Sequence, residues 1–456
     1  MVDQHPGVAV YNPYVAPQYG PAVDPRLRGV VTPWHRKQSV RIVSAVLICA
    51  FISLCAIAML LLLGNSFGIG VLTVAILAAF VPVPILVFAL LWLDRYEPEP
   101  WHYLMFTFAW GAFVATLAAL IINTTGSALV KDLTGQDATT TTAIFIAPPT
   151  EETAKAVPLF LMLFLVLIGR RVIHGVIDGI VYAGMAAIGF AFTENVLYFG
   201  GAYVEAADKG GGSDGLVALL TTFVMRAVMS PFAHPLFTSM TGIGVGLAAV
   251  TKSRAVRVLA PIGGLLLAIL LHGTWNALAT RQNLLLLGVG YLLIMIPLFI
   301  GLIVLAVWLR NKESRLVDTM LPVYVQHGWL TATDLTSLST IASRRTARST
   351  AHSYGGGYAA KAMQEFQLAA IKLALLRQSL VRGWASEDYG NQERELLSIL
   401  VSRRQYVATA AARWTANHGR QYWGWAGYQG LHAPYADSGH WPRQGGPYNS
   451  RHGGVR

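Results

Sequence analysis

Residues 42–63 read IVSAVLICAFISLCAIAMLLLL, a run without a charged residue. A helix needs about 20 such residues to cross a lipid bilayer, so this run alone is long enough. The whole chain has the same character. Of its 456 residues, 54% are hydrophobic and 12% are charged, whereas a soluble domain carries about 25% charged residues. The sequence therefore predicts an integral membrane protein.

Further apolar runs of spanning length lie at 70–93, 103–130, 143–169, 174–200, 216–250, 256–279 and 284–309. Together with the first run they predict an all-α, polytopic membrane helical bundle with about eight transmembrane helices. The run 216–250 is too long for one span and contains Ser230-Pro231, a favourable helix start. We therefore expect an interfacial or re-entrant piece near 216–228 and a spanning helix starting near Ser230.

The net charge of +11 could indicate nucleic-acid binding, but the basic residues lie in the tails and in alternate loops. The intervening loops are poor in Lys and Arg. This pattern is a topology signal, which predicts a multi-pass protein of the cell (plasma) membrane with both termini cytoplasmic and no nucleic-acid partner. The loop residues concerned are Arg36, Lys37, Arg41, Arg95, Arg170, Arg171, Lys252, Arg254, Arg257, Arg310, Lys312 and Arg315.

Composition divides the chain into four parts. Residues 1–38 are rich in Pro and Tyr and predict a disordered cytoplasmic tail. Residues 39–310 form the transmembrane domain. Residues 311–416 mix apolar and charged positions and predict a cytoplasmic helical region. Residues 417–456 are rich in Gly, Trp, Tyr and His, which predicts a second disordered tail.

Ionisable side chains inside the predicted spans are the strongest functional signal, because each costs about 2.5–3.5 kcal/mol on insertion scales. The alternating helix directions and a rise of about 1.5 Å per residue place five of them at a similar depth. Each lies roughly 6–14 Å from the outer, non-cytoplasmic end of its helix. Asp178 precedes Glu194 by sixteen residues and should lie about 24 Å away, so we assign it to helix capping or packing. The polar layer consists of Glu151, Glu152, Glu194, His234 and His272.

Local spacing adds partners to this layer. Lys155 lies one helical turn after Glu151 and Glu152 and can supply their counter-charge. His272 and Asn276 are four residues apart and share a helix face. Small residues crowd 183–191 and 242–246, which predicts close helix packing.

Five motifs follow one another along the chain: Glu151-Glu152-Thr-Ala-Lys155, Asp178-Gly-Ile-Val-Tyr182-Ala-Gly, Gly189-Phe190-Ala-Phe-Thr-Glu194-Asn195-Val-Leu-Tyr198, His234-Pro-Leu and His272-Gly-Thr-Trp275-Asn276. Over about residues 80–310, these motifs resemble the PrsW family of intramembrane proteases. More distantly, EE-x-x-K, F-x-x-x-E and H-x-x-x-N are similar to motifs of the CAAX prenyl endopeptidase and bacteriocin-immunity superfamily. Two differences from that superfamily are the closer spacing of Lys155 and a glutamate, Glu194, where the superfamily has histidine.

The resemblance implies peptide-bond hydrolysis in single-span membrane proteins, including membrane-anchored anti-sigma factors. Either Glu151 or Glu152 would be the general base that activates a water. His272 and Asn276 would hold the developing oxyanion.

The roles of Glu194 and His234 stay open at this point. They either complete a water site or, with His272, ligate a catalytic Zn²⁺, for which Glu, His and His with one open position would suffice. No H-E-x-x-H motif is present. Lys155, Asn195 and Trp275 are the expected supporting residues.

Two other classes of protein fit the sequence less well. A proton- or cation-coupled transporter also carries buried acids and histidines, but its polar residues should extend across the bilayer, and no inverted repeat is apparent. A membrane scaffold with a recruiting cytoplasmic tail leaves the polar layer unexplained. An intramembrane protease accounts for it best.

Overall fold

The computed structural model describes residues 34–95, 99–168, 172–281, 283–381 and 389–418. These residues are helical, with turns and short connections and no strand. They belong to two compact units, His35–Thr319 and the part from Met320 onward. The tails predicted for 1–38 and 417–456 lie, except for a few residues, outside the described residues.

Six stretches among the described residues are long and apolar enough to cross a membrane: Ile42–Leu93, Trp101–Thr134, Val176–Gly210, Gly212–Val250, Arg254–Thr280 and Leu284–Leu309. The number differs from the expected eight for two reasons. Two expected runs are joined in Ile42–Leu93, and α6 (Ala147–Leu167) is not among the six. The α6 helix carries two glutamates and a lysine, which lower its hydropathy.

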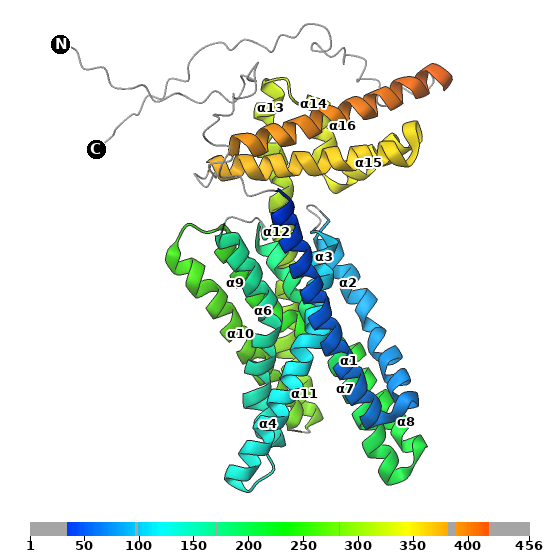
Figure 1. The fold of residues 1–456 in the computed structure, drawn as a ribbon, viewed down its shortest axis with the longest axis vertical. Helices are drawn as coiled ribbons and strands as arrows, with labels where there is room; N and C mark the ends of the chain where they lie inside the picture. Colours follow the sequence, from blue (N-terminus) through cyan, green and yellow to red (C-terminus); the bar gives the residue numbers. More distant parts are fainter. Residues whose placement is uncertain (1–33, 96–98, 169–171, 282, 382–388, 419–456) are drawn as a thin grey trace, which may run out of the picture. The chain divides into compact units, whose positions relative to one another are not determined.

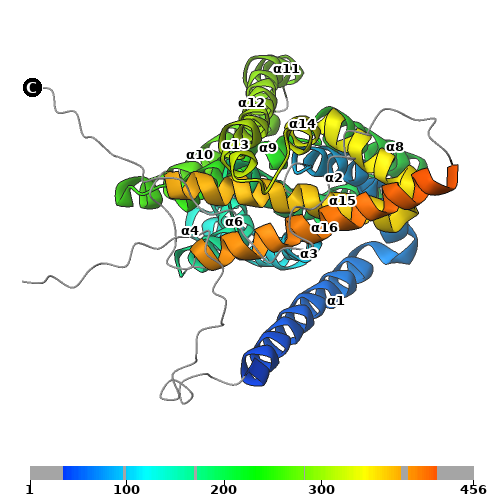
Figure 2. The ribbon, with the colours of Figure 1, turned by 90° about the horizontal axis from the view of Figure 1, so that it is seen from above.

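The first long stretch folds back on itself. Helix α1 (Trp34–Phe80) contains Gly68 with φ 72° and ψ 159°, outside helical geometry, and α2 (Pro82–Leu93) follows. A positive φ favours glycine, and the kink at Gly68 divides α1 into two legs. Figure 1 shows the chain folding back within this stretch. The two legs pack through Met59, Leu63, Ala75 and Ala79. Figure 2 shows the first leg along the outer edge of its unit, and its apolar side chains are largely exposed.

Helix α7 (Val176–Gly210) is the buried centre of the bundle, and 89% of its most apolar 18-residue stretch is buried. Neighbouring backbones approach it at glycines. A Cβ on Gly179 would lie 2.1 Å from the Gly242 carbonyl oxygen, and one on Gly189 would lie 2.0 Å from the Phe108 carbonyl oxygen. The small residues predicted to permit close packing therefore do so.

The other elements of this unit pack around α7 or connect its neighbours. They are α3 (Trp101–Ala109), η2 (Trp110–Ala115), α4 (Thr116–Thr134), α5 (Thr139–Thr141), η3 (Thr142–Ile146), α8 (Gly212–Phe223), η4 (Val224–Met229), α9 (Ala233–Val250), α10 (Arg254–Thr280), α11 (Leu284–Gly290) and η5 (Tyr291–Met295). The η elements are π-helical turns, which are rare and occur frequently at functional sites.

The expected break near Ser230 separates η4 from α9. The expected N-cap, Ser230, is wrong, because α9 begins at Ala233 and its N-cap is Phe232. The Ser230 hydroxyl donates to the Met225 carbonyl at 2.8 Å and so closes the end of η4 instead of capping α9.

Helix α12 (Ile296–Met320) leads out of the first unit, and α13 (Pro322–Gln326), α14 (Ala332–Ser339), α15 (Ile341–Val381) and α16 (Tyr389–His418) form the second. Figures 1 and 2 both show α15 and α16 side by side. Tyr324 and Tyr389 donate hydrogen bonds to the buried Glu393 carboxylate, the second at 3.0 Å. This cluster joins α13 to the start of α16.

Candidate active site

One turn of α6 supplies three charged groups to the interior of the bundle. Glu152 and Lys155 are fully buried, and Glu151 is 5% exposed. The Lys155 ammonium donates to Glu152 Oε1 at 2.7 Å and lies 3.9 Å from Glu151 Oε2. It also lies 4.1 Å from the centre of the Phe190 ring. Lys155 thus offsets the charge of the glutamate pair, as its spacing predicts.

Glu152 is held on both carboxylate oxygens. Its Oε1 lies 2.9 Å from His272 Nδ1 as well as contacting Lys155, and its Oε2 accepts a hydrogen bond from Thr238 Oγ1 at 2.8 Å. Because Thr238 is on α9 and His272 on α10, this carboxylate joins three helices. Glu152 is therefore suited to hold His272 and Lys155 in position.

Glu151 differs from its neighbour because one of its oxygens remains available. Asn123 Nδ2 donates to Oε1 at 3.3 Å, while the buried Oε2 has no hydrogen-bond partner. This Oε2 lies 3.8 Å from His272 Nε2. Of the two adjacent glutamates, Glu151 is the one that can accept a further proton, water or metal ion.

Glu194 and His234 form a second part of the site. Glu194 Oε2 makes a short ion pair with Arg226 and lies 2.8 Å from His234 Nε2. The other ring nitrogen, His234 Nδ1, is 3.2 Å from Lys155 Nζ. Because an ammonium group can only donate, we assign Nδ1 as the acceptor and place the imidazole proton on Nε2, where it is donated to Glu194.

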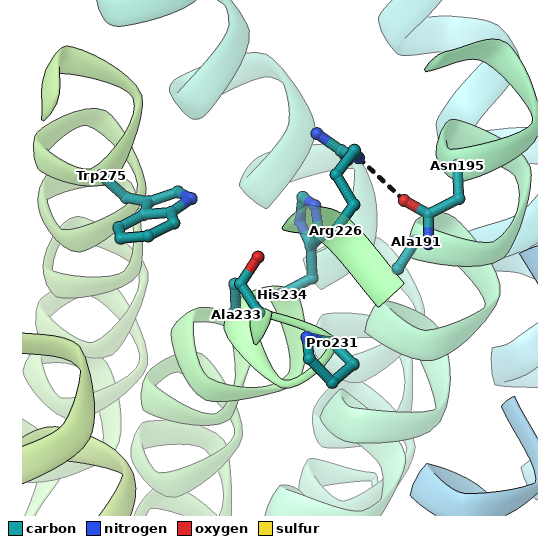
Figure 3. Close-up of a pocket in the computed structure, with 8 residues that line it drawn as sticks. Ala191, Asn195, Arg226, Pro231, Ala233, His234 and Trp275 are labelled. Carbon is teal, nitrogen blue, oxygen red and sulfur yellow. Dashed lines mark hydrogen bonds between the residues drawn. The ribbon is translucent and has the colours of Figure 1, made fainter. Parts of the chain in front are cut away.

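A polar cavity of about 30 Å³ adjoins His234. This volume is sufficient for about one or two water molecules. Figure 3 shows Arg226 and Asn195 joined across it, with Trp275 pointing toward it from α10. Arg226 Nε donates to Asn195 Oδ1 at 2.8 Å. The lining residues are Ala191, Asn195, Arg226, Ser230, Pro231, Ala233, His234 and Trp275.

Glu151, His234 and His272 have the chemistry of a metal site. Each offers one ligand atom, and these atoms lie within 4.8 Å of one another. One carboxylate and two imidazoles match the ligand set of a catalytic zinc. A second carboxylate contacts each imidazole, Glu152 at His272 and Glu194 at His234, an arrangement that orients metal-binding histidines. The residues present therefore fit the group, although His234 must release one of its two contacts to ligate.

The structure brings the predicted site residues together, with two differences in detail from the expected roles. Glu194 contacts His234 and Arg226. The carboxylate that belongs to the three-residue metal group is Glu151, not Glu194. Asn276 Nδ2 donates to the Ala143 carbonyl at 2.9 Å and ties α10 to η3. Its role at an oxyanion stays a prediction, which requires this hydrogen bond to be exchanged.

Three site residues were not expected from the sequence: Asn123, Arg226 and Thr238. Arg226 had a visible signal, since it is the one basic residue in the apolar segment 216–229. Thr238 lies one helical turn after His234, a weaker signal. Asn123 had none, because its partner Glu151 is 28 residues away on another helix.

Comparison with known proteins agrees with this geometry. Residues 99–302 match the model of the PrsW family intramembrane metalloprotease. The chain is also similar to Protease PrsW of Clostridioides difficile (strain 630), with 28% identity over 200 residues that make up 44% of this chain and 76% of that protein. No solved structure matches the chain. Over residues 99–302, this multi-pass membrane protein is thus similar to the PrsW family of intramembrane metalloproteases, which are peptidases.

Proposed function

We propose that the protein is an intramembrane endopeptidase that cleaves single-span membrane proteins with a water activated at Glu151. The observation that carries the assignment to Glu151 is its buried Oε2, which has no hydrogen-bond partner and lies 3.8 Å from His272 Nε2. Glu152 has no comparable oxygen, because Lys155, His272 and Thr238 hold both of its oxygens.

In the proposed reaction, Glu151 Oε2 takes up the proton of the attacking water as the oxygen adds to the scissile carbonyl. The carbonyl oxygen then becomes negative. Lys155 supplies positive charge beside it, and His272 Nε2 can donate a hydrogen bond to it when that nitrogen carries a proton. In the alternative in which Glu151, His234 and His272 hold Zn²⁺, the ion would supply a Lewis acid for the carbonyl, and Glu151 would be a ligand rather than the proton acceptor.

An apolar groove beside α6 is the proposed path of the substrate's membrane segment. It has a volume of about 480 Å³, and its lining is mostly apolar. Its walls include Thr150 and Ala154, the neighbours in sequence of Glu151 and Lys155, so an occupant would lie against the turn that carries the catalytic carboxylate. The lining residues are Trp110, Val114, Ala115, Ala118, Ile122, Pro149, Thr150, Thr153, Ala154 and Val157.

The biological setting is part of the same proposal. The protein crosses the plasma membrane about eight times with both termini cytoplasmic, as the alternation of basic loops supports. The family resemblance supports membrane-anchored regulators of the anti-sigma-factor type as substrates. The match to a peptidase family favours this reading over a transporter.

The decisive experiment uses the purified full chain with a panel of single-span substrates. We expect Glu151→Gln and His272→Ala to lower the cleavage rate by at least about 100-fold, because each removes a group that acts on the reacting atoms. Glu205→Gln is the matched control, since Glu205 lies on α7 like Glu194 but its side chain is 74% exposed. Cleavage at the normal rate by both Glu151→Gln and His272→Ala would overturn the proposal.

Metal removal tests the zinc assignment separately. We expect a chelator to abolish cleavage and added Zn²⁺ to restore it in the unaltered protein. His234→Ala should lower the amount of zinc retained, whereas Glu205→Gln should not. Chelator-resistant cleavage by protein in which elemental analysis finds no metal would eliminate zinc and leave Glu151 as a metal-free proton acceptor.

The groove is tested by filling it. Thr153→Phe adds a ring to the groove wall and should reduce cleavage of membrane-anchored substrates while leaving the unfolding temperature within a few degrees of its original value. Leu161→Phe is the control, because Leu161 is an exposed residue of the same helix, outside the groove. Equal cleavage by the two variants would exclude the groove as the substrate path.

A further inference from the structure

A second cluster of metal-ligating side chains lies at the start of α7, sixteen residues before Glu194. Glu99 lies two residues before the start of α3, and His174 and Asp178 lie on either side of the start of α7. Their ligand atoms lie within 4.8 Å of one another. His174 Nδ1 is 3.4 Å from Asp178 Oδ2 and 3.9 Å from Glu99 Oε1. The Asp178 carboxylate accepts the His174 backbone N–H at 2.5 Å, which ties the first turn of α7 to the residue before its N-cap Gly175.

The Glu99 carboxylate is fixed in place and still has an available oxygen. The Tyr182 hydroxyl donates to its Oε2 at 2.5 Å, and the Glu99 backbone N–H donates to Asp94 Oδ2 at 2.9 Å. Its Oε1 is buried and has no hydrogen-bond partner. Because His174 and Asp178 lie on the same side as this oxygen, Glu99 points an unused acceptor into the cluster.

Among the described residues, the charges at this end of the bundle are arranged differently from those in the active site. The Glu99 and Asp178 side chains are 3% and 7% exposed. No Lys or Arg nitrogen of the described residues lies within 4.0 Å of either carboxylate, whereas Lys155 and Arg226 lie beside the glutamates of the active site. A cation bound between the two carboxylates would balance their charges.

We propose that Glu99, His174 and Asp178 bind a divalent transition-metal ion, best matched by Zn²⁺, at a site separate from the catalytic group. Two carboxylates and one imidazole are suitable zinc ligands, and water can fill the fourth position. The His174 side chain is 29% exposed, which gives the ion access from water. The site ties the chain before α3 to the start of α7. It acts as a clamp between two segments that are 75 residues apart.

The test uses the full chain in detergent, stripped of metal and titrated with Zn²⁺. All variants are made in a His272→Ala background, which removes a ligand of the catalytic group. We expect this protein to bind one zinc per chain by elemental analysis and to unfold at a higher temperature when zinc is added. His174→Ala should weaken zinc binding at least about tenfold and remove the thermal shift. His102→Ala, which alters an exposed histidine of α3 outside the cluster, should do neither.

Glu99→Gln is the second variant, because it keeps the shape of the side chain and preserves a partner for Tyr182. It should also lose zinc binding, even if His174→Ala fails to fold. The proposal is overturned if His272→Ala protein binds no zinc, or if His174→Ala or Glu99→Gln retains zinc with unchanged affinity. Cleavage activity plays no part in these readings, so failure of the catalytic proposal would leave this one standing.

Discussion

The charges around Lys155 explain how three carboxylates can be buried in the interior of a membrane bundle. Lys155 contacts Glu152, lies within ion-pair distance of Glu151 and reaches His234, while Arg226 pairs with Glu194. A fully buried ammonium without these acids would be very costly, and the acids without it equally so. The site is therefore a coupled charge network rather than a set of independent side chains.

This network makes a prediction for Lys155→Met. Removing the ammonium leaves Glu152 with a buried charge, so the free energy of unfolding should fall by about 3–5 kcal/mol. The double variant Lys155→Met/Glu152→Gln should recover most of the loss, because no unbalanced charge remains at that pair. Thermal or denaturant unfolding in detergent measures both effects. A double variant that is no more stable than Lys155→Met would contradict the charge explanation.

At these residues, sequence spacing predicts a part of the site and no more. Glu151, Glu152 and Lys155 share one turn because residues three and four apart in a helix are neighbours whatever surrounds them. Which glutamate keeps a free oxygen could not be predicted in this way. The answer depends on Asn123 and Thr238, which reach the site from other helices.

At the scale of elements, glycines determine how closely α7 and α9 approach. A Cβ on Gly242 would lie 2.2 Å from the Gly179 carbonyl oxygen and 2.7 Å from Ala183 Cβ. The site depends on this approach, because α9 carries His234 and Thr238. Glycine-rich sequences predict that helices pack closely. They do not predict which glycine meets which backbone, because that pairing follows from the rotation of each helix.

We therefore expect Gly242→Ala to separate α7 from α9, to lower the free energy of unfolding by about 1–3 kcal/mol and to reduce cleavage. Gly263→Ala on α10 is the control, because a Cβ there meets nothing within 4 Å. It should be neutral or stabilising by up to about 1 kcal/mol, in line with the helix propensities of Gly and Ala. Similar unfolding temperatures for the two variants would show that a methyl group at position 242 can be accommodated between α7 and α9.

At the scale of the whole molecule, the sequence predicted an all-helical membrane protein, since long apolar runs leave few alternatives. The number of passes was less certain, for reasons visible in two places. The stretch Ile42–Leu93 joins two runs through Gly68, and α6, which the apolar run 143–169 predicted as a span, carries three charged residues and is not among the six candidate spans. Helices that form a catalytic site in a membrane are those whose composition departs most from a simple span.

Topology gives a prediction at this scale. Single cysteines placed at exposed Lys252 and Lys312, in a chain without Cys49 and Cys55, should react with a membrane-impermeant reagent only after the cytoplasmic face is opened. A cysteine at exposed Asp137 should react in intact cells, because the proposed topology places its loop on the other side. Labelling of Lys252→Cys in intact cells would contradict a cytoplasmic location for both termini.

The burial of α7 on nearly every side also has a consequence for biogenesis. Translation delivers α7 to the membrane before α9 and α10, so Glu194 is made before its partners Arg226 and His234 exist. Until those residues are synthesised, Glu194 lacks its ion pair, and an acid in lipid costs about 2.5–3.5 kcal/mol. Helices α3 and α6 precede α7 in synthesis and pack against it. They are therefore already present as packing partners when α7 enters the membrane. The order of the helices along the gene is thus also a workable order of assembly.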